Sequence, residues 1–160
     1  MRKAFIGVLA SGLVAGAGLG LTATASATTA AAPSGGTTLS FVSHPTSDKV
    51  FHLGSSKAFG AGYVELVAGN DMRGSTKIGH DDSVQTVTRL SGGTADEVVT
   101  VTFALAGGQI STMGVVTSTP SGPGTFELAI TGGTGKYASA RGYATVVPAN
   151  APKVTLHITR

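Results

Sequence analysis

The chain has 160 residues, with no cysteine and 11 Lys plus Arg against 8 Asp plus Glu. Arg2 and Lys3 precede an apolar run, and without this N-terminal segment the formal net charge falls from +3 to +1, which is 9 basic minus 8 acidic residues. So small a charge makes no case for a nucleic-acid partner, and the absence of cysteine excludes a disulfide-stapled scaffold.

The first 27 residues have the pattern of a secretion signal. Residues 4–21 are apolar and contain five glycines, and Ala25-Ser26-Ala27 provides the small-x-small site of a signal peptidase. A single membrane anchor is the alternative, which the glycines and the cleavage site disfavour. We therefore expect a signal peptide at 1–27, a flexible lead segment at 28–37, and a secreted domain at 38–160 with no membrane contact after cleavage.

The first half of the domain predicts short strands separated by turns. Residues 39–43 form a first strand, which we expect His44-Pro45 to end, and residues 49–53 are compatible with a short second piece. Residues 63–67 alternate as a strand, and Gly69-Asn70-Asp71 predicts the turn that follows it.

The second half gives stronger strand patterns. Residues 83–90 are rich in Thr and Val, and residues 96–106 are the longest candidate, with Val99, Val101, Phe103 and Leu105 on one face. Gly107-Gly108 predicts a hairpin to residues 110–116. A turn-rich loop at 118–124 follows, and the chain ends on an alternating strand at 153–159.

A glycine corner lies between two further strands. Residues 125–131 alternate, with Phe126, Leu128 and Ile130 on one face; Gly132, Gly133 and Gly135 then predict a tight structural turn. KYASA suits about one helical turn, and residues 141–147 read as the next strand. The corner lacks the spacing of a phosphate-binding loop and no long helix follows it, so we predict no nucleotide cofactor.

Roughly eight strands and no long helix indicate an all-β domain. Antiparallel strands of this number and length form either a sandwich or a closed barrel. A barrel is favoured because it leaves no strand edges exposed in an exported chain without cysteine.

The segment TFELAITGGTGKYASARGYATV resembles the most recognisable stretch of the allene oxide cyclase and dirigent barrel superfamily. The matching residues are Thr131, Gly132, Gly133, Thr134, Gly135, Tyr137, Ala140 and Gly142. The resemblance implies a calycin-like, eight-stranded antiparallel closed barrel from about residue 38 onward, with an apolar lumen. It also implies self-association, often as a homo-trimer through the barrel wall.

The acids that this resemblance would assign are missing. Pro45 occupies the place of the dirigent Asp after His44, and Lys136 stands where many dirigent sequences carry Asp in the corner. A carboxyl in an apolar lumen has a raised pKa and can transfer protons near neutral pH. Pro45 has no proton to transfer, and Lys136 carries the opposite charge. The remaining catalytic candidates are Glu65, Asp71 and Arg141, although Glu65 is also well explained as a solvent-facing carboxylate.

Other polar residues have either a binding or a structural interpretation. Tyr63, Asn70, Tyr137 and Tyr143 are candidate ligand contacts, although buried tyrosines more often serve packing. His80-Asp81-Asp82 is tested as a metal site, but adjacent residues on an extended chain point to opposite faces, so we interpret it as a polar turn and predict no metal.

Three functions follow as hypotheses. The leading one is a secreted barrel that binds a small apolar molecule in its lumen without clear catalytic acids. The second is an isomerase or cyclase of allene oxide cyclase or dirigent type, which steers stereochemistry by confinement. The third is a structural or interaction module of the cell envelope.

Overall fold

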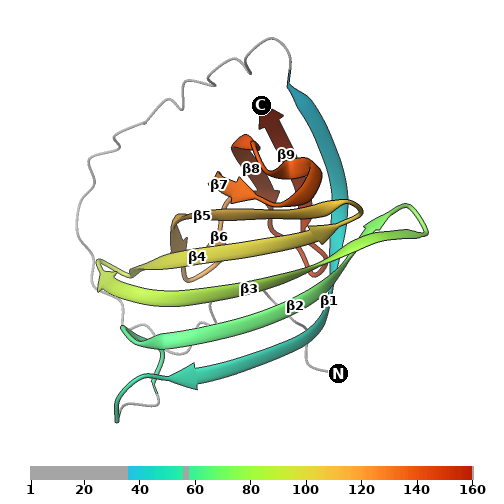
Figure 1. Cartoon of the computed structure of the whole chain (residues 1–160). Helices are drawn as coiled ribbons and strands as arrows, with labels where there is room; N and C mark the ends of the chain where they lie inside the picture. Colours follow the sequence, from blue (N-terminus) through green and yellow to red (C-terminus); the bar gives the residue numbers. More distant parts are fainter. Residues whose placement is uncertain (1–35, 56–57, 160) are drawn as a thin grey trace.

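The computed structural model describes residues 36–55 and 58–159 (Figure 1). The expected signal peptide, and all of the lead segment before residue 36, lie outside these residues. The described chain forms nine strands and one short 3-10 helix. They are β1 (Thr37–His52), β2 (Tyr63–Arg73), β3 (Thr76–Ser91), β4 (Thr94–Leu105), β5 (Gly108–Thr119), β6 (Gly122–Pro123), β7 (Phe126–Gly133), η1 (Gly135–Tyr137), β8 (Arg141–Val147) and β9 (Lys153–Thr159).

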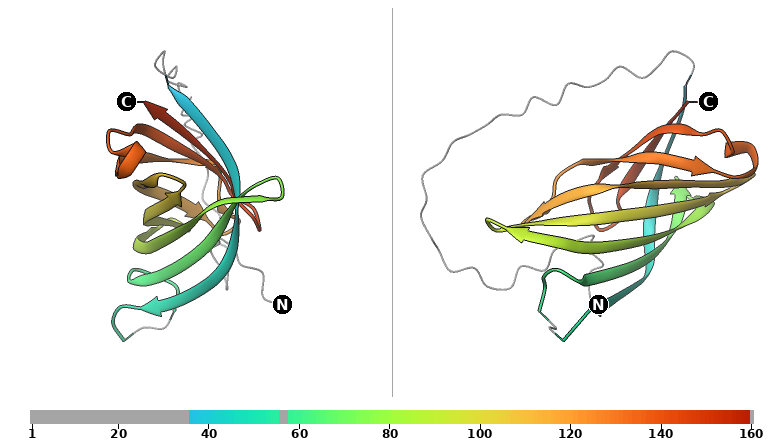
Figure 2. Two further views of the ribbon diagram at one scale, coloured as in Figure 1. Left: turned by 45° about the vertical axis from the view of Figure 1, so that its right-hand side comes forward. Right: turned by 60° about the vertical axis from the view of Figure 1, so that its left-hand side comes forward.

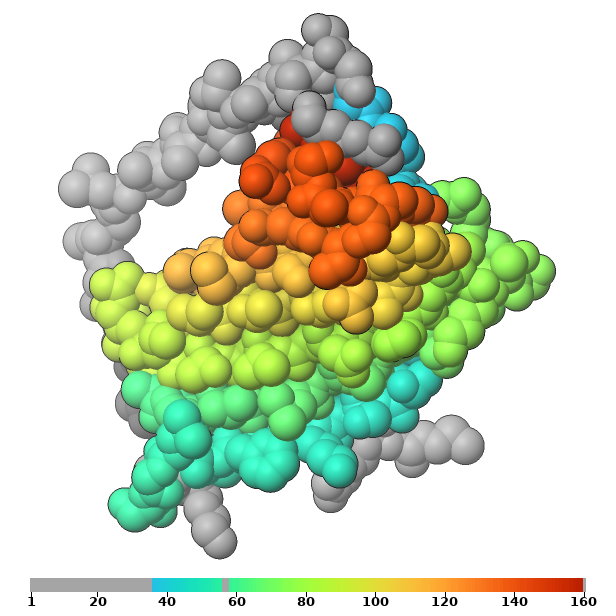
Figure 3. Space-filling model, in the orientation of Figure 1, coloured from blue at the N-terminus to red at the C-terminus, as the bar shows by residue number. Residues whose placement is uncertain are grey.

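The strands close into an eight-stranded antiparallel barrel. The order is β4-β3-β2-β1-β9-β8-β7-β5, and β5 pairs back onto β4, while the two-residue β6 pairs with the end of β5. Figure 2 shows the strands curving around one lumen, and Figure 3 shows side chains of β3, β4 and β5 forming a continuous wall. The predicted barrel is thereby confirmed. Among the described residues, no helix has the length and apolar character needed to cross a membrane.

Strand β1 is longer than the sequence pattern predicted. His44-Pro45 does not end it, because the strand passes through a bulge between Pro45 and Ser47 and continues to His52. The reason lies in the pairing. β1 pairs with β9 only as far as Val42 and with β2 alone beyond that point, so the missing N–H of Pro45 costs no ladder hydrogen bond on the free side.

Two segments that we interpreted as turns lie inside strands. Gly69-Asn70-Asp71 belongs to β2, whose turn comes later at Gly74, and His80-Asp81-Asp82 belongs to β3. Both interpretations were wrong, because these residues pair with each other: Asn70 lies opposite His80 and Gly69 opposite Asp81. Alternation then buries Asp71 and Asp81 and exposes His80 and Asp82.

The hydrophobic core fills one part of the barrel. The apolar faces predicted for residues 99–105, 126–130 and 154–158 all point inward, and Phe103 meets Phe41 edge-to-face with ring centroids 5.5 Å apart. Leu128, Ile110 and Leu156 are fully buried in the same cluster. Burial of each such side chain contributes roughly 1.5–3 kcal/mol, so the core is the main source of stability.

The glycine corner closes onto the β4–β5 hairpin. The Lys136 N–H donates to the Gly107 carbonyl and the Thr134 N–H to the Gln109 carbonyl, and the predicted helical turn is present as η1. Gly135 has a φ of 57°, and a Cβ there would collide with the Gly107 carbonyl oxygen. Glycine is therefore required at this position by both conformation and space.

Candidate functional site

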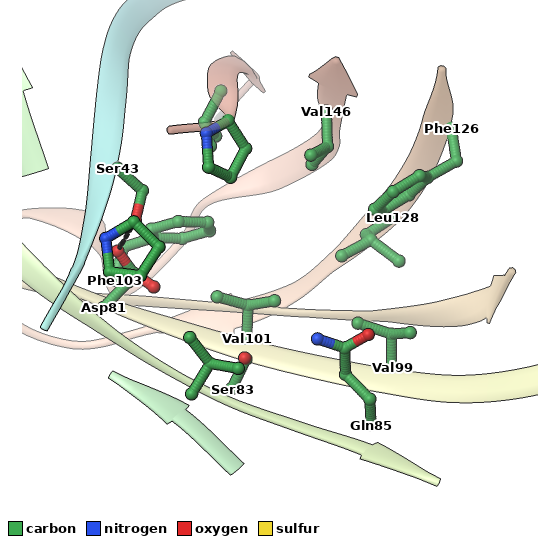
Figure 4. A pocket seen from close by; sticks show the side chains of 14 residues that line it. Ser43, Asp81, Ser83, Gln85, Val99, Val101, Phe103, Phe126, Leu128 and Val146 are labelled. Carbon is green, nitrogen blue, oxygen red and sulfur yellow. Dashed lines mark hydrogen bonds between the residues drawn. The ribbon is translucent and has the colours of Figure 1, made fainter. Parts of the chain in front are cut away.

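A cavity opens into the lumen beside the core. Its volume is about 500 Å³, open mouth included, and most of its wall is apolar. Val101, Phe126, Leu128 and Val146 point into it from three strands (Figure 4). Pro45 and Pro152 line it where β1 parts from β9. Phe103 and Leu128 belong both to this wall and to the core, so the cavity directly adjoins the core.

The polar part of the wall is on β1 and β3. The Ser43 hydroxyl donates to the Asp81 carboxylate over 2.6 Å, and Ser83 and Gln85 continue the polar row along β3 (Figure 4). Gly69 on β2 lies between the two partners; a Cβ there would come within 2.7 Å of the Asp81 carboxylate and collide with the Ser43 hydroxyl. The glycine that looked like a turn residue leaves room for this hydrogen bond.

Asp71 lies behind this pair on the inner face of β2. Its side chain is fully buried, and neither carboxyl oxygen has a hydrogen-bond partner. Burial first, and the neighbouring Asp81 carboxyl second, raise the pKa of Asp71 to about 8, while Lys77 acts in the opposite direction. Asp71 is therefore a carboxyl that retains its proton near neutral pH.

A second acidic group lies further along the same wall. Glu65 is buried, pairs across the strands with Gln85, and has its pKa raised to about 8, by burial first and then by Asp48 and Glu97. Burial also raises the pKa of Glu97, against a smaller opposite effect of Ser118, and one Glu97 carboxyl oxygen has no partner. Glu65 is thus an interior residue and not a solvent-facing one.

These raised pKa values predict that the protein loses stability as the pH rises. Folded Asp71 and Glu65 keep their protons up to about pH 8, whereas the unfolded chain releases them near pH 4. The folded state binds more protons in that window, so the free energy of unfolding should fall between about pH 5 and about pH 8.5. Urea unfolding at both pH values measures the difference.

Asp71→Asn is the variant that isolates one carboxyl. Asp71→Asn should make the loss of stability with rising pH clearly smaller. Asp82 is an exposed residue of the neighbouring strand β3, and Asp82→Asn should leave the loss of stability unchanged. An unfolding free energy that rises over this range would contradict the assignment.

The candidate residues from the sequence lie in different places. Glu65 and Asp71 face the interior. Asn70 is on the outer face, Tyr143 stacks on His157 with ring centroids 4.4 Å apart, and the exposed Arg141 donates to the Ala140 carbonyl.

The other two tyrosines pack within the protein. Tyr137 is buried at the corner with the Lys136 ammonium over its ring, and Tyr63 meets His52 and Phe59 edge-to-face. None of the seven candidates is among the described residues that line the cavity.

Sequence reasoning missed the polar residues that do line the cavity: Ser43, Asp81, Ser83 and Gln85. A signal for them exists, because Asp81, Ser83, Gln85 and Val87 recur at every second position and continue the strand predicted from residue 83. In the part of the chain that the structure describes, no three His, Asp or Glu side chains are arranged to hold a metal ion.

A closed eight-stranded barrel with a mainly apolar lumen and a few grouped polar side chains is an architecture that suits small molecules.

No protein-family model matches the sequence, and no curated relative matches it. Solved structures do share the fold. One is a pyocyanin demethylase, 21% identical, with a TM-score of 0.67 over 77% of this chain and 100% of that one.

Two further structures share the fold, and the first carries a name that the corner motif suggested. A pterocarpan synthase dirigent protein is 18% identical, with a TM-score of 0.60 over 77% of this chain and 88% of that one. A Diels–Alderase from Streptomyces koyangensis is 15% identical, with a TM-score of 0.59 over 81% and 72%. The resemblance to the dirigent-like barrels is therefore confirmed for the fold.

Proposed function

We propose that this barrel binds one small, mainly apolar molecule in its lumen. The observation that carries the proposal is a cavity in the lumen with an apolar wall and its polar side chains grouped on one side. Ligand pockets in proteins combine apolar walls with a few polar groups that fix orientation. Phe126, Leu128 and Val101 would contact the body of the ligand, and Asp81 and Gln85 its polar end.

Filling the cavity should abolish binding. Val101→Phe adds a ring to a side chain that points into the cavity, whereas Val98→Phe adds the same ring to the outward face of the same strand. N-phenyl-1-naphthylamine is a neutral probe whose fluorescence rises in apolar sites. We expect the native protein and Val98→Phe to enhance it, and Val101→Phe to bind it at least about tenfold more weakly, which corresponds to about 1.4 kcal/mol.

The two variants also separate loss of binding from loss of fold. Overpacking costs about 1–3 kcal/mol, so circular dichroism must first show that Val101→Phe is folded. Equal enhancement by folded Val101→Phe and by the native protein would reject lumenal binding.

A second function, an isomerase or cyclase that steers stereochemistry, is favoured by one feature of the site. Asp81 lines the cavity, and Asp71 behind it holds a proton near neutral pH, so the pair can supply acid and base to a confined intermediate. Dirigent and Diels–Alderase structures share the fold.

Chiral chromatography of the products of an allene oxide tests this second function. It predicts one enantiomer in excess, and a loss of roughly 10²–10⁴ in rate for Asp81→Asn. A racemic product formed at the spontaneous rate would dismiss it.

A further inference from the structure

The charges of this protein are unequally divided between surface and interior. All seven Lys and Arg side chains among the described residues are exposed. Four of the eight acidic side chains, by contrast, are buried on the inner wall: Glu65, Asp71, Asp81 and Glu97. Burying a carboxylate without a cation is costly, and this cost keeps protons on Asp71 and Glu65 near neutral pH. Asp81 is the buried acid that lines the cavity, and no described Lys or Arg side chain is buried beside it.

Among the described residues, few side chains donate hydrogen bonds to these acids. Asp81 receives one hydrogen bond from a protein side chain, the hydroxyl of Ser43. Asp71, which is fully buried, has two oxygens without partners, and Glu97, which is 8% exposed, has one. An ionised carboxylate has about four acceptor positions and no donor, so Asp81 can accept further hydrogen bonds from a ligand in the cavity.

The acids also follow the cavity along the barrel wall. Val67 on β2 and Val99 on β4 line the cavity, and the preceding inward-facing residue on each strand is an acid, Glu65 and Glu97 respectively. Gln85, which also lines the cavity, lies opposite Glu65 in the sheet. The acidic wall therefore extends from Asp81 past Gln85 to the end of β2 at which β1 is paired on one side only. An ionised carboxylate such as that of Asp81 attracts a positive charge and repels a negative one.

We propose that the lumen selects an organic cation, a molecule with an apolar body of ring size and one amine or cationic nitrogen that meets the Asp81 carboxylate. The proposal rests on the proposed function, because it names the chemical class of the ligand for the same cavity. The nitrogen supplies hydrogen-bond donors and a positive charge to the Asp81 carboxylate, and the body packs against Phe126 and Leu128. Anionic ligands, including free fatty acids, are disfavoured.

Three naphthalene probes of nearly equal size test this selection. 1-Naphthylmethylamine is a cation at neutral pH, 1-naphthalenemethanol is neutral and 1-naphthoate is an anion. Isothermal titration calorimetry should find the amine bound roughly ten- to a hundredfold more tightly than the alcohol, because the ammonium adds charge attraction to the hydrogen bond with Asp81 that the alcohol can also make. The anion should bind more weakly than both.

The variants assign the effect to a residue. Asp81→Asn should reduce binding of the amine to the level of the alcohol, and Asp82→Asn, the adjacent outward residue, should leave the preference intact. If Asp81→Asn does not fold, Asp81→Ser replaces it and should reduce the preference in the same direction, because it also removes the carboxylate. Alcohol binding as tight as amine binding, or a preference that survives removal of the Asp81 carboxylate, would overturn the proposal while lumenal binding stands. If none of the three probes binds, both proposals are rejected.

Discussion

Phe103→Ala is expected to lower the free energy of unfolding by about 3–5 kcal/mol, the range for truncating a buried phenylalanine. Its ring is 1% exposed, packs edge-to-face on Phe41 and separates the core from the cavity. The variant loses the apolar contacts and the aromatic pair, and the space it leaves joins an existing cavity. Urea denaturation at constant pH measures the change.

The matched control for Phe103 is an exposed ring. Phe51 is 50% exposed at the far end of β1, so Phe51→Ala should change the same quantity by less than about 1 kcal/mol. If Phe103→Ala cost no more than Phe51→Ala, the core would not lie where the structure has it.

Gly135→Ala is expected to cost about 2 kcal/mol or more. A left-handed backbone costs an L-residue about 1–2 kcal/mol, and the collision of the new Cβ with the Gly107 carbonyl adds an overpacking cost of about 1–3 kcal/mol. The substitution acts where the corner docks on the β4–β5 hairpin. The same denaturation measurement reports its effect.

Gly74 separates the two contributions to this cost. Its φ of 58° nearly equals the 57° of Gly135, but a Cβ there meets no atom within 4 Å. Gly74→Ala should therefore show the conformational cost alone, about 1–2 kcal/mol. Equal losses from the two variants would mean that the corner does not pack on the hairpin as described.

The sequence predicted the fold best where one face of a strand is apolar. Residues 99–105 and 126–130 carry the period of two without interruption, and both face inward as expected. The tight turn at the glycine corner was predicted equally well, because Gly135 and the glycines before it favour backbone conformations that other residues resist. From these strands, a closed barrel followed.

The prediction failed where polar residues lie inside the barrel. Gly69-Asn70-Asp71 and His80-Asp81-Asp82 have the composition of turns, because Gly, Asn and Asp are the residues that turns favour. They form strand instead because they pair with each other, and pairing between segments ten residues apart is not visible in either segment alone. Asp81, which lines the cavity, belongs to the second of these segments, so this part of the site was missed together with the strand.

The proposed occupied lumen is tested most directly by native mass spectrometry of the protein purified from its own host. We expect a species heavier than the chain by the mass of one small molecule, which denaturation releases and which Val101→Phe lacks. A chain that carries nothing, or the same adduct on folded Val101→Phe, would contradict the account.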